Sequence, residues 1–417
     1  MTNISKYFIA TALLFGAVTG RAAATSGEDS LRVSEGDSTA IAVPVEKHVE
    51  KKSVVNFTNK KIGKVLTIDP VEGNGGTYKF SLEGRVQTRF DLSRAAESGE
   101  YSHKLWFRRA RLKSSGHIYS KKLGYKVELD LVNNEILDAI IKYKFAPNTT
   151  LWVGQTKLDG NRERVISSQN LQFVDRSRLN SNYNIDRDLG VQVHHHMNLG
   201  GWIVRESFAV STGEGKNYTT YTGEHTIKEG LSYTGRVEVL PFGKFSGKKG
   251  EYVSSDLERE ATPKLAVGAT YSVNDNAFRD RGQRGSELSA SRDLYAFFVD
   301  AMFKYRGFSA MGEYAYRSTD ESAVVLNTAE SFEAFRTGQG LNLQAGYLFK
   351  NNFEVAGRFT QIWPEQDIRR QEVKEYTLGL SKYIIGHKIK AQTDFSYSDF
   401  ATDEDQLMWR LQFEISI

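Results

Sequence analysis

The chain has 417 residues, a net charge of +4, a mean hydropathy of −0.46 and no cysteine. Beyond residue 24, no segment approaches 18 consecutive apolar residues, which excludes a helical membrane protein. The nearly balanced charge gives no indication of a nucleic-acid partner, and without disulfides the stability must come from the backbone ladder.

The N-terminus has the pattern of a secretory signal. Lys6 precedes an apolar run over 8–18, and small residues follow at 22–24. The run is short of the roughly 20 residues that span a bilayer, so we predict a cleaved signal peptide over 1–24. Residues 25–76 mix charges and glycine with short apolar runs, which predicts a weakly ordered periplasmic arm or a small accessory strand pair.

Side chains alternate between apolar and polar from Tyr78 onward. One face of this first segment carries Tyr78, Phe80, Leu82, Val86 and Phe90, and charged or polar residues lie between them. The segment runs for about 13 residues, whereas the average strand has about 5 to 6, so the pattern favours a strand between lipid and water. The last segment, 407–417, alternates in the same way.

Comparable segments recur along the rest of the chain. They lie at 77–92, 104–118, 122–132, 137–146, 149–158, 187–197, 201–211, 228–240, 263–274, 293–306, 307–318, 339–350, 352–363, 372–384, 386–398 and 406–417. About sixteen strands predict an all-β, transmembrane antiparallel β-barrel over 77–417, in the outer membrane and in contact with its lipid. The connection 241–262 is too long for a periplasmic hairpin: it is either an insertion or a missed strand pair, so eighteen strands stay the alternative.

The connection 159–186 is the longest before mid-chain, and we predict that this third extracellular loop folds inward. A sixteen-strand barrel is otherwise an open channel, so an inward loop is the simplest filter. The loop contains Arg162, Arg164, Arg176 and Arg178. The first five strands also carry more cations than acids on their inward faces, namely Lys79, Arg85, Arg89, Arg109, Arg111, Lys113, Lys126, Lys142, Lys144 and Lys157 against Glu83, Asp91, Glu128, Asp130 and Asp138. Rings of Arg and Lys select anions, although incidental charge in a solvated lumen is the alternative.

The free-energy cost of exposing a cation to lipid predicts which side chains of the second strand face the lumen. A cation facing lipid at the midplane costs roughly 2 to 4 kcal/mol, so Arg109, Arg111 and Lys113 should face the lumen. Trp106 and Arg108 then face outward. We expect a β-bulge, or a contact between barrels, to accommodate Arg108.

Residues 107–111, Phe-Arg-Arg-Ala-Arg, resemble the F-R-R-A motif of the phosphate-selective porin O/P family. The resemblance extends from about Tyr78 to Phe413. The stretches that support it are Gly154-Gln155, Glu163-Arg164, Ser167-Ser168, Asp175-Arg176-Ser177 and Asp188-Leu189-Gly190.

The resemblance implies a homotrimer of sixteen-strand barrels that pass inorganic phosphate or other small anions. By position, Arg108 and Arg109 match the paired arginines of the constriction, Arg164 matches a basic loop residue, and Asp138 loosely matches an acidic one. The complete set of candidate binding residues is Arg85, Arg108, Arg109, Arg111, Arg164, Arg176 and Asp138.

Three positions depart from the family pattern. Gln169 stands where phosphate-binding members have a lysine, Arg111 replaces a tyrosine-like residue, and the chain ends in Ile417 instead of phenylalanine. The first two departures keep the cation count but move its placement. A pyrophosphate, a sugar phosphate or a carboxylate therefore remains an alternative substrate. A general porin without phosphate selectivity, or a barrel with a binding or structural role, remains an alternative function.

No convincing pattern for catalysis, a metal or a cofactor is found. The segments 307–312 and 230–235 miss the G-x-S-x-G spacing by one residue. In the run His194-His195-His196, alternation sends the side chains to opposite faces, which favours interfacial histidines over a metal site. We therefore expect a channel and not an enzyme.

Overall fold

The computed structural model describes residues 55–58, 66–70, 78–217, 230–248, 250–326 and 332–417. The predicted signal peptide lies outside the described residues, and so does the predicted arm apart from two short strands. These strands, β1 (Val55–Thr58) and β2 (Leu66–Pro70), form an antiparallel pair. Strand β2 also pairs with the start of β3, where Leu66 lies opposite Leu82.

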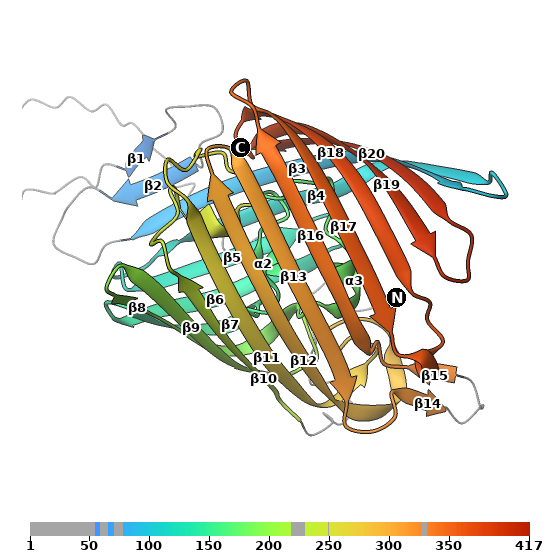
Figure 1. Ribbon diagram of the computed structural model, residues 1–417. Coiled ribbons are helices and arrows are strands. Elements are labelled where there is room, and N and C mark those ends of the chain that lie inside the picture. The colour runs from blue at the N-terminus through green and yellow to red at the C-terminus, as the bar shows by residue number, and fades with distance from the viewer. Residues whose placement is uncertain (1–54, 59–65, 71–77, 218–229, 249, 327–331) are drawn as a thin grey trace, which may run out of the picture. The chain divides into compact units, whose positions relative to one another are not determined.

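Sixteen antiparallel strands form a closed barrel, because the last strand, β20, pairs with both β19 and β3 (Figure 1). They are β3 (Lys79–Ala95), β4 (Tyr101–His117), β5 (Leu123–Asp130), β6 (Glu135–Ala146), β7 (Thr149–Lys157), β8 (Arg187–Leu199), β9 (Trp202–Ser211), β10 (Ser232–Leu240), β11 (Lys264–Arg279), β12 (Glu287–Tyr305), β13 (Phe308–Thr319), β16 (Gly338–Leu348), β17 (Phe353–Pro364), β18 (Val373–Ile385), β19 (Ile389–Phe400) and β20 (Gln406–Ser416). The predicted sixteen-strand barrel is confirmed.

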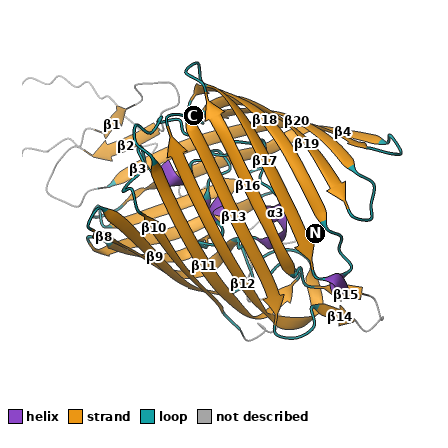
Figure 2. Ribbon diagram, in the orientation of Figure 1, coloured by secondary structure: helices purple, strands orange, loops and turns teal. Residues whose placement is uncertain are grey.

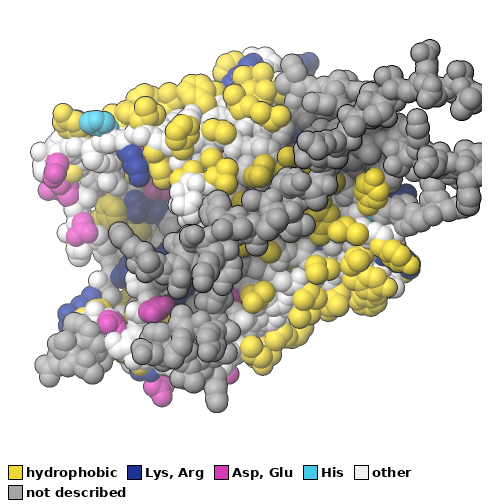
Figure 3. All heavy atoms as spheres, turned by 180° about the vertical axis from the view of Figure 1, so that it is seen from behind, with side chains coloured by type: hydrophobic (Ala, Val, Ile, Leu, Met, Phe, Trp, Pro, Cys, Tyr) yellow, Lys and Arg dark blue, Asp and Glu magenta, His cyan; other side chains and the backbone are white. Residues whose placement is uncertain are grey.

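The wall of the barrel has two chemically different faces. In β10, Arg236 and Glu238 are buried toward the lumen, whereas Tyr233 and Val237 are exposed on the outside. Figure 3 shows the outer hydrophobic side chains in yellow and charged side chains in the hollow at the left of the view. This alternation is what a strand between hydrocarbon and water requires.

The third loop folds into the barrel, as predicted. It contains the helices α2 (Arg162–Val165) and α3 (Arg178–Tyr183), which lie inside the ring of strands (Figure 2). Its apolar residues Leu158, Leu179 and Ile185 are buried with Phe298 and Ala315 of the wall. A small hydrophobic core that the loop shares with the wall therefore holds the loop in place. Among the described residues, no helix is long and apolar enough to cross a bilayer.

The long connection 241–262 is an insertion and not a strand pair. Its described residues, all but 249, contain only the 3₁₀ turn η2 (Gly250–Tyr252), so the eighteen-strand barrel is wrong. It also folds inward, and its Phe245 is buried beside Ile166 of the third loop. The remaining elements lie in outer connections: the hairpin of β14 (Val324–Leu326) and β15 (Phe332–Ala334), and the 3₁₀ turn η3 (Gln366–Ile368).

Candidate functional site

Strand β4 carries a β-bulge at Arg108. In the ladder between β3 and β4, Gln87 lies opposite Arg109 and Thr88 lies opposite Phe107. Arg108 is therefore the extra residue between two regular pairs, which is the arrangement of a β-bulge. The bulge expected at this position is confirmed, and Arg108 does not lie in open lipid: its side chain points to the third loop and is 27% exposed.

On the N-terminal side of the bulge, the side chains that face the lumen differ from those that strict alternation predicts. Trp106 lies opposite Arg89, and its indole donates a 3.2 Å hydrogen bond to Asp91. The prediction that Trp106 faces outward is wrong, because strict alternation does not continue across a bulge. On the other side of the bulge, Arg109 and Arg111 line the lumen, as predicted.

Three guanidinium groups converge on Asp175 of the third loop. Its carboxylate lies 2.6 Å from Arg89 and 3.1 Å from Arg108, and 3.6 Å from Arg109. Burial raises the pKa of this carboxyl, but attraction to Arg108, Arg109 and Arg89 outweighs burial and leaves that pKa well below its usual range. Arg89 also pairs with Asp91 at 2.7 Å, so three cations face two carboxylates and the cluster keeps an excess positive charge.

Arg85 and Arg111 approach the third loop beside this cluster. Arg85 Nη2 donates to Ser168 Oγ at 2.8 Å, and Arg111 Nη1 lies 3.5 Å from the same hydroxyl. Arg111 also forms ion pairs with Glu128 at 3.2 Å and with Asp130 at 3.7 Å. Both arginines thus attach the loop to the wall of the barrel.

The third loop supplies further cations. Arg164 Nε donates to Asp186 at 2.9 Å. Lys157, where β7 meets the loop, and Arg176 donate to backbone carbonyl groups of the loop, at 2.6–3.2 Å. Neither Lys157 nor Arg176 has an ion-pair partner within the described part of the chain. These two positive charges are therefore not cancelled by a direct carboxylate contact.

Asp138 is the acidic residue of the predicted set. It pairs with Lys126 and, at 3.0 Å, with Arg187, and it accepts a 3.0 Å hydrogen bond from Thr156. This carboxylate therefore orients Lys126 and Arg187, and its single negative charge leaves the other cations of the wall unpaired with it. Sequence reasoning did not single out Arg187.

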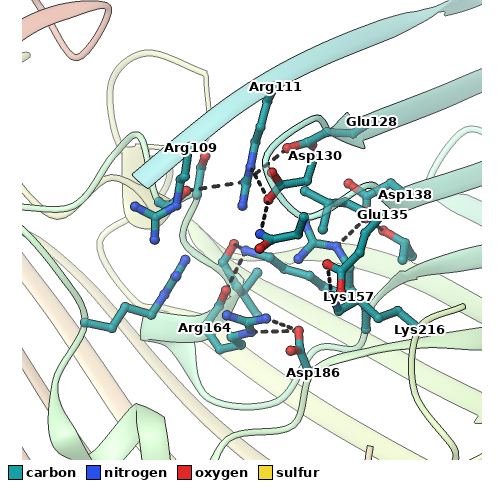
Figure 4. Close-up of a pocket in the computed structure, with 18 of the residues that line it drawn as sticks. Arg109, Arg111, Glu128, Asp130, Glu135, Asp138, Lys157, Arg164, Asp186 and Lys216 are labelled. Carbon is teal, nitrogen blue, oxygen red and sulfur yellow. Dashed lines mark hydrogen bonds and ion pairs between the residues drawn. The ribbon is translucent and has the colours of Figure 1, made fainter. Parts of the chain in front are cut away.

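Most of these groups line one cavity of about 520 Å³ between the third loop and strands β4 to β8. Its lining contains twelve Arg and Lys side chains and seven Asp and Glu side chains. Figure 4 shows Arg109 and Arg111 on one side of the cavity and Arg164 on another. A polar, water-accessible cavity with this excess of cations is suited to attract and pass small anions.

Six of the seven predicted residues line this cavity: Arg108, Arg109, Arg111, Arg164, Arg176 and Asp138. Arg85 is not part of the lining, but it contacts Ser168, which is. Two other arginines of the loop lie elsewhere. Arg162 is fully buried and pairs with Glu238 and Asp300 at 2.7 Å, and Arg178 pairs with Glu375.

Sequence reasoning gave no role in the cavity to eight charged residues of its lining: Glu135, Asp159, Asp175, Asp186, Arg187, Lys216, Arg284 and Arg410. Arg410 lies on the polar face of the last predicted strand, so alternation could have identified it. Lys216 and Arg284 belong to outer connections that show no sign of turning inward in the sequence. Their positions depend on contacts between distant segments.

The side chains of the histidine run contact different partners. His194 lies 3.4 Å from Asp159 and stacks on Trp152, whereas His195 pairs with Glu206 at 3.0 Å. No group of three or more potential metal ligands occurs in the described ranges. All three histidines line a second cavity of the lumen, next to the cationic one.

Comparison with known proteins agrees with this geometry. The family described as phosphate-selective porin O and P matches residues 80–407. An uncharacterised protein of Aquifex aeolicus (strain VF5) is 24% identical over 423 residues, which cover 92% of this chain and 96% of the relative.

Solved structures share the fold. An anion-selective porin from Comamonas acidovorans has a TM-score of 0.55 at 10% identity, over 82% of this chain and 100% of that chain. A loop-deletion mutant of OmpT, an outer membrane protein of Vibrio cholerae, has a TM-score of 0.53 at 10% identity, over 82% and 99%. The chain therefore belongs to the phosphate-selective porin O and P family and is an outer-membrane porin, a channel and not an enzyme.

Proposed function

We propose that this porin is anion-selective and passes phosphate or polyphosphate-type anions. The observation that carries the proposal is the excess of twelve cations over seven acids around the cavity between the third loop and β4. An anion entering this cavity exchanges water for guanidinium and ammonium donors, whereas a cation meets net repulsion. Phosphate suits the site because arginine donates to two of its oxygens at once.

The family description and the name of the Comamonas acidovorans porin support an anionic substrate. The departure at Gln169 does not weaken the cavity. The Gln169 side chain donates to Ser416 at the end of β20 and is not part of the lining. The cations that would contact an anion therefore come from β4 and from the third loop.

The test is a bilayer recording of the purified protein under a KCl gradient, followed by addition of phosphate. We expect a reversal potential that shows preference for chloride, and a chloride current that falls as phosphate occupies the site. A preference for potassium contradicts anion selectivity. An unaltered chloride current in phosphate contradicts phosphate binding, and parallel additions of pyrophosphate, a sugar phosphate and a dicarboxylate then rank the alternative substrates.

Arg111→Ala tests the cavity directly. Without this cation, Glu128 and Asp130 lose a partner, so the anion-to-cation permeability ratio should fall by about threefold or more. Arg111→Lys keeps the charge and should retain most of the selectivity. Lys350→Ala removes an equal charge from the exposed turn between β16 and β17 and serves as the control.

We also propose that the porin is a homotrimer. Strand β5 pairs only with the part of β4 from Arg111 to His117, so the other end of β4 has no second strand partner among the described residues. Leu105, 78% exposed, and Phe107 lie on this free part of the strand. A subunit contact would cover this edge and its apolar side chains.

The N-terminal assignments complete the proposal. Residues 1–24 would direct export and be removed, and 25–76 would form an arm on the periplasmic side. The antiparallel pair of β1 and β2 next to β3 supports a short ordered element within that arm. N-terminal sequencing of the mature protein tests the cleavage site.

A further inference from the structure

The periplasmic insertion, residues 241–262, fills part of the barrel. Its Phe245, Glu251, Ser255 and Asp256 are buried. It joins β10 to β11, at the same end of the barrel as the short turns 146–149 and 306–307. Short turns of a porin lie on the periplasmic side, so the insertion folds into the exit and not into the outer mouth.

Contacts with distant strands keep the insertion in place. Lys304 of β12 donates at 2.8 Å to the carbonyl groups of Gly250 and Ser255. Asp256 accepts a 2.7 Å hydrogen bond from the backbone of Gly307, between β12 and β13. Arg259 donates at 2.7 Å to the carbonyl of Leu348, at the end of β16. The insertion therefore extends across the periplasmic end of the barrel from β10 to β16.

The insertion and the third loop are joined to each other. The Ser254 amide donates to the Asn170 carbonyl at 3.0 Å, and Arg162 of α2 donates to the Glu251 carbonyl at 3.1 Å. A shared carboxylate makes a further connection, because Glu354 of β17 accepts from Gln172 of the loop and from Ser255 of the insertion, both at 2.7 Å. Ile166 and Leu171 of the loop also pack with Phe245. Together the two segments close the side of the lumen formed by β11 to β19.

The other side of the lumen contains a second cavity, of about 360 Å³, between the insertion and strands β7 to β10. Trp152, Asp159 and Val165 line both cavities, so the two are adjacent. The second lining is no longer cationic, with three Arg or Lys side chains and four acids. A channel needs such a change, because an ion must bind well enough to enter and weakly enough to leave.

We propose that ions leave the cationic cavity through this second cavity, past Trp152, Asp159 and Val165, and that the insertion and third loop seal the opposite side. The route applies whichever anion permeates. Thr150 of β7 and Ser207 of β9 line the exit. Ser309 of β13 and Ser381 of β18 lie on the sealed side, against Gln172.

The absence of cysteine allows a direct test, because each single cysteine is the only thiol in the full-length porin. Four variants are compared: Thr150→Cys, Ser207→Cys, Ser309→Cys and Ser381→Cys. A methanethiosulfonate reagent that carries a sulfonate is added on the periplasmic side during bilayer recording. We expect the first two variants to react and to lose about half of their chloride current or more, since each gains a fixed negative charge and bulk in the path.

The two variants on the sealed side should keep their current and stay unmodified, as mass spectrometry of the recovered protein can verify. Blocking at Ser309→Cys or Ser381→Cys, or no modification at Thr150→Cys and Ser207→Cys, overturns the route. The reversal potential of the unmodified channel is a separate measurement. A failure of anion selectivity is therefore distinguishable from a failure of the route.

Discussion

At the scale of single residues, Asp175 holds the arginines of β3 and β4 together. We predict that Asp175→Asn loosens the third loop, because Arg89, Arg108 and Arg109 then repel one another without a shared carboxylate. The anion-to-cation permeability ratio should rise about twofold, since the cavity loses a negative charge. Trypsin should also cleave the folded protein faster after Arg176, as bilayer selectivity and timed proteolysis can measure.

The matched control is Glu97→Gln, which removes the same charge from the exposed turn between β3 and β4. It should change neither selectivity nor proteolysis. An Asp175→Asn channel that behaves like the wild type in both assays would show that the third loop does not depend on this carboxylate.

The pKa of Asp175 predicts how the third loop responds to pH. Burial raises the pKa of Asp175, but Arg108, Arg109 and Arg89 lower it further, to well below its usual range. A carboxyl whose folded pKa is depressed stabilises the structure fully above its free value of about 3.9 and loses that contribution only as the pH falls through the folded value. The third loop should therefore stay attached to β3 and β4 through Asp175 from about pH 8 to about pH 4, as resistance to a protease that is active over this range can measure. Faster cleavage of the third loop already near pH 5 would contradict this role of Asp175.

At the scale of an element, the bulge in β4 decides which side chains face water. Deleting Arg108 removes only the extra residue, so the pairs Gln87–Arg109 and Thr88–Phe107 become adjacent in a regular ladder and Trp106 keeps its inward face. No cation is turned to lipid, which would cost roughly 2 to 4 kcal/mol at the midplane, so the deletion should change the free energy of unfolding about as little as the loss of the Arg108 side chain alone. Arg108→Ala keeps the bulge and loses one partly exposed ion pair, which is worth about 1 kcal/mol or less.

Urea unfolding in lipid vesicles measures both variants. A deletion variant that unfolds clearly more easily than Arg108→Ala would mean that the register of residues 101–107 depends on the extra residue.

The same element shows what a sequence can predict. Period-two patterns predicted the barrel strands, since an alternating side chain reports directly on lipid or water at its own position. The cost of a lipid-facing cation predicted the bulge at Arg108, but its effect on Trp106 required the paired strand. The position of Asp175 and the inward fold of 241–262 depend on contacts between residues far apart in the chain, which local periodicity does not encode.

At the scale of the whole molecule, the wall of the barrel is uneven. Strand β5 ends at Asp130, whereas the hairpin of β3 and β4 extends past the ends of neighbouring strands in Figure 1. The backbone groups of β4 from 101 to 109 have no strand partner on that side among the described residues. Open strand edges do not persist in hydrocarbon, because each unpaired group costs free energy there. This part of β4 should therefore be covered by another subunit.

Leu105→Asp tests this subunit contact. A carboxylate at this exposed position would be desolvated in an interface without a partner, so the trimer should dissociate while each barrel stays folded. Unheated gel electrophoresis and native mass spectrometry in detergent measure the change. Leu378→Asp places the same charge on the outer face of β18, where the side chain is 55% exposed, and should leave the trimer intact. Dissociation by both variants would indicate general destabilisation, and dissociation by neither would assign the free edge of β4 to a partner other than a second copy.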